Sequence, residues 1–146
     1  MQTFLPYSDL KDSLAVLDYR RLGKQRVETK QLLMALNGET KGWVNHPAAK
    51  MWRGYETALA MYGALSCQIW LQRGYKDSLL SYFEERMNAP VVLPPWLGDE
   101  RVHASHRSNL LRKDAQFYGQ YAWAEPADLP YIWPVLTDYG YKLETR

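Results

Sequence analysis

The sequence has little of the residue types that mark secreted and membrane proteins. It holds one cysteine, Cys67, in 146 residues, so no internal disulfide can form and a reducing, cytoplasmic location is expected. No apolar run approaches the roughly 18 residues that a membrane span needs. Residues 1–6 also lack the basic and apolar regions of a signal peptide. We therefore expect an intracellular protein that does not enter a membrane.

Several motifs of well-known enzymes are also missing. The chain contains no Walker motif, no Gly-x-Gly-x-x-Gly fingerprint and no Gly-x-Ser-x-Gly elbow. His103 and His106 lie one helical turn apart, but no carboxylate or cysteine completes a metal-ligand set beside them. Cys67 is better explained as a small buried hydrophobe than as a nucleophile. The sequence therefore predicts no metal and no cofactor.

The composition is that of a globular domain. Hydrophobic residues make up 47% and charged residues 23% of the chain, and 146 residues can enclose a core, so we expect one domain over 1–146. Helical periodicity predicts helices over about 12–36, 47–73, 77 or 78 to 87, and 99 or 100 to about 118–120. The tail, rich in proline and aromatic residues, is expected to be irregular. The prediction is an all-α, compact single domain of three main helices, a short helix and long Pro/aromatic-rich loops.

The stretch 17–28 interrupts the apolar face of the first expected helix. Arg21, Gln25 and Glu28 fall on the face that carries leucines before and after them. Burying unpaired charge costs several kcal/mol, so these groups need compensation. Either Arg21 and Glu28 form a structural ion pair, or the three residues face a cleft in which a ligand binds.

Basic residues concentrate in two segments, 18–30 and 101–113, although the net charge is only +2. Two basic helices could flank one groove and neutralise phosphates, or they could simply face solvent. The candidate DNA contacts in these segments are Arg20, Lys24, Arg26, His103, Arg107, Arg112 and Lys113. Asn45 and His46 precede Pro47 at an expected helix start. They could cap this helix, or they could line a substrate pocket.

The α-amine of the chain is a further chemical resource. A free α-amine is partly unprotonated at neutral pH and can form a Schiff base when a carboxylate lies nearby. Because Gln2 is a large second residue, we expect Met1 to be retained. Met1, Arg21, Gln25 and Glu28 are thus the candidate catalytic residues.

The order of several short motifs resembles one known family. Segments 7–10 (Tyr-Ser-Asp-Leu), 18–20 (Asp-Tyr-Arg), 51–52 (Met-Trp), 71–77 and 103–112 are similar in sequence and order to the phage-type pyrimidine-dimer DNA glycosylase/AP lyases. This resemblance implies a bundle of three main helices that kinks double-stranded DNA and extrudes a base. It also implies that the N-terminal amine attacks C1′ of a damaged nucleotide, that a first-helix glutamate assists, and that β-elimination follows.

The chain departs from the family at the catalytic pair. The family's glutamate directly follows the Tyr-Arg pair, where this chain has Arg21, and the next carboxylate along the same face is Glu28. Gln2 stands where the family has a threonine. Three hypotheses follow: a DNA glycosylase, with or without lyase activity; a non-catalytic DNA-binding relative; or an enzyme for a nucleotide or nucleoside on the same scaffold. We expect a monomer that binds double-stranded DNA.

Overall fold

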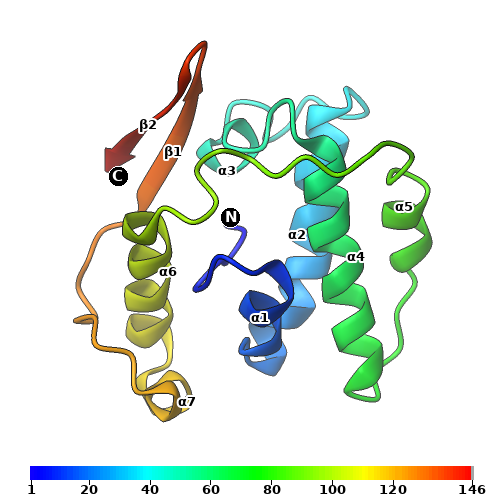
Figure 1. The fold of residues 1–146 in the computed structure, drawn as a ribbon. Helices are drawn as coiled ribbons and strands as arrows, with labels where there is room; N and C mark the ends of the chain where they lie inside the picture. Colours follow the sequence, from blue (N-terminus) through cyan, green and yellow to red (C-terminus); the bar gives the residue numbers. More distant parts are fainter. Residues whose placement is uncertain (146) are drawn as a thin grey trace.

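The fold is mostly helical, with a small sheet at its C-terminal end (Figure 1). The computed structural model describes residues 1–145, and within them it has seven α-helices, one 3-10 helix and one two-stranded sheet. The elements are α1 (Leu10–Ala15), α2 (Tyr19–Leu36), α3 (Pro47–Lys50), α4 (Glu56–Gln72), α5 (Leu80–Glu84), α6 (Glu100–Lys113), α7 (Ala115–Tyr118), η1 (Gly119–Tyr121), β1 (Ile132–Thr137) and β2 (Gly140–Thr145). The all-α prediction is therefore correct for the bulk of the chain and wrong for its tail.

The tail folds back on itself as a β-hairpin. β1 pairs antiparallel with β2, from Ile132 opposite Thr145 to Thr137 opposite Gly140. Gly140 has φ +140°, a backbone conformation that residues other than glycine rarely adopt. Pro134 lies within β1, which a two-stranded sheet tolerates because each strand has one unpaired edge. The prolines of the tail exclude helix, as expected, but they do not exclude this hairpin.

The first expected helix is two helices. α1 ends at Ala15 and α2 begins at Tyr19, with Asp18 in an extended conformation between them. The backbone N–H of Asp18 donates to the Tyr118 hydroxyl over 3.1 Å, and that hydroxyl donates to the Asp18 carboxylate. A partner 100 residues away therefore fixes the break, which local periodicity could not indicate.

The second expected helix is also divided. The short α3 is followed by a turn in which Gly54 has φ +86°, and α4 then begins at Glu56. Met51 and Trp52 in this turn are fully buried. The indole N–H of Trp96 donates to the carbonyl of Met51 over 2.8 Å, which ties the turn to the loop before α6. The last helix likewise ends early, because Asp114 leaves the helical conformation and caps α7 through Phe117.

The core forms where α2 packs along α4, and glycines permit the closest approaches. A Cβ on Gly63 would lie 2.3 Å from the ring of Phe83, so α5 can rest on α4 only at a glycine. Residues 1–7, named here the N-terminal segment, run between the α2–α4 pair and α6 (Figure 1). No helix among residues 1–145 is both long and apolar enough to cross a membrane.

Candidate functional site

The side-chain amide of Gln25 holds the N-terminal segment against α2. Its Nε2 donates to the carbonyl of Gln2 and its Oε1 accepts from the backbone N–H of Phe4, both over 2.7 Å. The Tyr62 hydroxyl of α4 contacts that same Oε1 and lies 2.8 Å from the carbonyl of Phe4. Burial raises the pKa of Tyr62 well above its usual value, so the phenol stays neutral. Gln25 is only 1% exposed, and its amide anchors the segment's backbone.

Two histidines of α6 hold the other side of the segment. His106 Nδ1 accepts from the backbone N–H of Leu5, and His103 Nδ1 lies 2.8 Å from the carbonyl of Leu5. His103 Nε2 accepts from the backbone N–H of Gly98. Burial lowers the pKa of both rings, that of His106 to about 3, so both are neutral at physiological pH. His103 is fully buried, whereas the predicted contact with DNA needs an exposed side chain.

The carboxylate of Glu28 lies beside the start of the chain. Its Oε2 accepts from the backbone N–H of Gln2 over 3.3 Å. Covalent geometry keeps consecutive backbone nitrogens within about 3.7 Å, so the Met1 nitrogen lies within about 7 Å of that oxygen. The structure therefore brings together Met1 and Glu28, two of the residues that the sequence proposed as catalytic.

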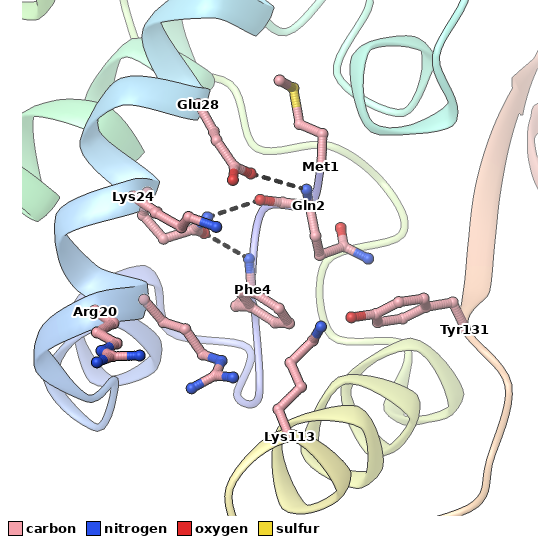
Figure 2. Close-up of a pocket in the computed structure, with 10 residues that line it drawn as sticks. Met1, Gln2, Phe4, Arg20, Lys24, Glu28, Lys113 and Tyr131 are labelled. Carbon is pink, nitrogen blue, oxygen red and sulfur yellow. Dashed lines mark hydrogen bonds between the residues drawn. The ribbon is translucent and has the colours of Figure 1, made fainter.

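A pocket of about 600 Å³ opens over this point (Figure 2). Its lining residues are Met1, Gln2, Phe4, Arg20, Arg21, Lys24, Gln25, Glu28, Lys113 and Tyr131. Figure 2 shows Lys113 of α6 and Tyr131 pointing toward the residues of α2 from the opposite side. Glu28 is the one carboxylate among the lining residues, against four cationic side chains. The pocket therefore suits an anionic ligand that places one of its groups beside the Glu28 carboxylate.

Arg21 and Glu28 do not form the structural ion pair that the sequence left open. Arg21 instead contacts Asp18 at 3.2 Å, one turn earlier. Burial opposes ionisation of Asp18, but hydrogen bonds from Tyr118 and Arg21 outweigh it and lower the pKa of Asp18. Glu28 is left to the pocket and the N-terminal segment.

Two of the arginines proposed to contact DNA are instead held in ion pairs. Arg26 contacts Asp77 at 2.5 Å, and its side chain is 12% exposed. Arg107 pairs with both Glu100 and Glu125, and its side chain is 11% exposed. Their guanidinium groups are therefore neutralised and largely covered, whereas the predicted contacts with DNA need exposed cations.

The remaining predicted DNA contacts are better placed. Arg20, Lys24 and Lys113 line the pocket. Arg112 is exposed beside it on α6, and its guanidinium donates to the carbonyls of Ala127 and Leu129. Cationic side chains from two helices, α2 and α6, thus line the same opening.

Asn45 and His46 lie outside the pocket. His46 caps α3, with its Nδ1 accepting from the backbone N–H of Ala48 over 3.0 Å. Its ring contacts those of Trp43 and Trp133 edge-on. Asn45 is exposed in the loop before it. The capping interpretation is confirmed for His46, and neither residue is among those that line the pocket.

Three lining residues were not foreseen from the sequence: Gln2, Phe4 and Tyr131. Gln2 and Phe4 line the pocket because they follow Met1 in the same N-terminal segment. Tyr131 carries no local signal, because the fold of the tail was not predicted. Burial raises the pKa of Tyr131 to about 12, so its phenol remains a hydrogen-bond donor in the pocket. Among residues 1–145, no group of three or more His, Cys, Asp or Glu side chains could hold a metal ion.

Comparison with known families gives one match that covers more than half of the chain. Residues 1–82 match the family model described as pyrimidine dimer DNA glycosylase. The chain belongs to this family. The match spans α1 to α4 and the start of α5, and so includes Met1, Arg20, Lys24 and Glu28 but neither Lys113 nor Tyr131. Neither the curated proteins nor the solved structures give a match.

Proposed function

We propose that this member of the pyrimidine dimer DNA glycosylase family is, as a single domain, a DNA N-glycosylase with AP-lyase activity on a damaged or modified base in duplex DNA. The observation that carries the proposal is the Glu28 carboxylate beside the first residues of the chain, on the wall of a cation-lined pocket. Met1 would supply the nucleophile as a free α-amine, and Glu28 would act as the acid and base.

The chemistry needs an amine and one carboxylate within reach of a single sugar. The Met1 nitrogen forms a bond to C1′, and the glycosidic bond breaks as the base leaves with its electron pair and takes up a proton. The amine then loses a proton as the C1′–O4′ bond opens and O4′ takes up a proton, which gives an imine. Removal of a C2′ proton expels the 3′ phosphate. Glu28 is suited to these proton transfers because it is the pocket's one carboxylate.

The cations of the pocket have a separate role in the proposal. Arg20, Arg21 and Lys24 on α2, and Lys113 on α6, would neutralise phosphates on either side of the extruded nucleotide. Arg21 stands at the position where the family resemblance expects a glutamate. We propose that Arg21, which lines the pocket although it also pairs with Asp18, binds phosphate and that Glu28, two turns further along α2, takes the glutamate's role.

Reductive trapping tests the nucleophile. The protein, prepared with Met1 as its first residue, is incubated with a duplex that carries a cyclobutane pyrimidine dimer, and in parallel with an abasic duplex, in the presence of borohydride. Reduction turns an imine into a stable covalent adduct. We expect the adduct on the peptide that contains Met1, located by mass spectrometry. An adduct on Lys24 or Lys113 instead would contradict the role of Met1.

Substitution of the carboxylate tests the acid–base role. Glu28→Gln keeps an acceptor for the Gln2 backbone and removes the titratable group, so base release should fall by about 10²–10⁴-fold. Glu84→Gln, an exposed glutamate on α5, is the matched control and should leave the rate unchanged. Duplex binding without base release, unaffected by Glu28→Gln, would instead identify a non-catalytic relative. Binding of a free nucleotide without duplex affinity would identify an enzyme of nucleotides.

A further inference from the structure

A second groove lies along α2 next to the first pocket. Its volume is about 390 Å³, and its lining residues are Tyr19, Arg20, Gly23, Lys24, Val27, Glu28 and Trp70. Arg20, Lys24 and Glu28 also line the first pocket, so the two hollows share a ridge formed by these side chains. A molecule that fills the first pocket would extend over the ridge into the groove.

Aromatic rings form one wall of this groove. Tyr19 stacks on Trp70 with ring centroids 5.3 Å apart and planes 24° apart, and Tyr75 packs against both rings. Tyr19 is 55% exposed although it belongs to this stack. The stack therefore ends in a flat aromatic surface that is open to solvent beside the groove.

Gly23 lets the Trp70 indole pack closely against α2 in the groove. A Cβ at this position would lie 3.1 Å from Cη2 of Trp70, so any larger residue would press on the indole. Val27, one turn further along α2, also lines the groove and is 47% exposed. Exposed apolar side chains gathered at one place commonly mark a binding surface.

The charges at the rim decide which ligand fits best. Arg20 and Lys24 border an apolar, aromatic hollow, a combination that suits a nucleotide, with its flat base and its phosphate. An apolar protein segment would leave both cations without partners. The groove's own pairing of a π-surface with two cations therefore favours nucleic acid.

We infer that this groove binds an unpaired nucleobase next to the nucleotide held in the first pocket. The base packs against the exposed ring of Tyr19, and its phosphate lies on the ridge between Arg20 and Lys24. The inference rests on the proposed function for the identity of its strand, but its test does not depend on catalysis.

Binding of two single-stranded octamers at fixed low salt tests the inference. One is oligodeoxythymidylate, and the other has the same phosphates but abasic tetrahydrofuran sugars. The wild-type protein should prefer the thymidylate octamer by about 5- to 150-fold, which corresponds to one stacked base. Tyr19→Ala should reduce this preference toward one and leave the affinity for the base-free octamer unchanged. Tyr19→Phe, which keeps the ring, should retain it.

Tyr139→Ala provides the matched control, because Tyr139 is fully exposed between β1 and β2, away from the groove. It should change neither affinity. Equal binding of both octamers by the wild type, or no binding of either, would overturn the inference. A base preference that survives Tyr19→Ala would do the same, since the base would then stack elsewhere. A preference for the thymidylate octamer without any borohydride adduct would support base binding in this groove and contradict the proposed chemistry.

Discussion

Gln25 and Phe4 are joined by a 2.7 Å hydrogen bond from the backbone N–H of Phe4 to the side-chain oxygen of Gln25. The other half of the same amide donates to the carbonyl of Gln2, so one side chain binds two residues of the N-terminal segment as a neighbouring β-strand would. The position of Met1 over the pocket depends on this amide.

Gln25→Ala should therefore both destabilise the fold and abolish activity. Two buried backbone groups would lose their partners, which predicts a loss of about 3 kcal/mol in the free energy of unfolding, measured by urea titration. Gln31→Ala, on the exposed face of the same helix, should cost little. If Gln25→Ala had the stability of the wild type and still gave the borohydride adduct, the anchoring role would be disproved.

The fold should weaken in mild acid because of His106. Burial lowers the pKa of His106 to about 3 in the folded state, while in the unfolded chain its pKa is the ordinary 6.5. Between these values the unfolded state binds the additional proton, so stability is complete above pH 6.5 and falls as the pH decreases. From pH 7 to pH 5, His106 alone should remove about 2 kcal/mol.

His106→Asn tests this pH dependence. The Asn oxygen can replace Nδ1 as the acceptor for Leu5 and does not titrate, so the slope of stability against pH should decrease by about one proton. Urea titrations at several pH values between 7 and 5 measure the slope directly. A variant with the wild-type slope would show that another group causes the acid sensitivity.

Thr29 offers a stabilising substitution. Its hydroxyl is buried on α2 and has no hydrogen-bond partner. Thr29→Val keeps the branched shape and removes the unsatisfied group, which should increase the free energy of unfolding by about 1 kcal/mol. A decrease would reveal that the hydroxyl is satisfied in solution, for instance by a bound water.

Lys113 should act on DNA affinity through charge alone. Lys113→Gln should weaken binding of any duplex and reduce the slope of log K against log salt by about 0.9, the amount expected for one phosphate contact. Lys41→Gln, on the exposed loop before α3, serves as the control and should leave the slope unchanged. An unchanged slope in Lys113→Gln would remove α6 from the proposed DNA surface.

The sequence predicted those parts of the molecule that local pattern controls. Helical spacing identified the long helices and the polar interruption at Arg21, Gln25 and Glu28. The capping interpretation of His46 also came from its neighbours in the chain. The family resemblance was confirmed by the match over residues 1–82.

The parts that were missed depend on partners far away in the chain. The break at Asp18 is fixed by Tyr118, and the burial of His103 follows from its bond to Leu5. The ion pairs of Arg26 and Arg107 likewise join residues that sequence spacing cannot connect, such as Asp77 and Glu125. The sequence shows that a basic side chain on a helix could bind a phosphate, but only the fold shows whether an acidic side chain already pairs with it.

The path of the opening residues also determines when the protein can become complete. Leu5 is synthesised about a hundred residues before the two histidines that hold its backbone. Until then the N–H and carbonyl of Leu5 have only water as a partner, and α6 is not yet present to pack on the other side of the N-terminal segment from α2 and α4. Assembly of the pocket is consequently one of the last events of synthesis, and a chain shortened before α6 would have no means of fixing its own beginning.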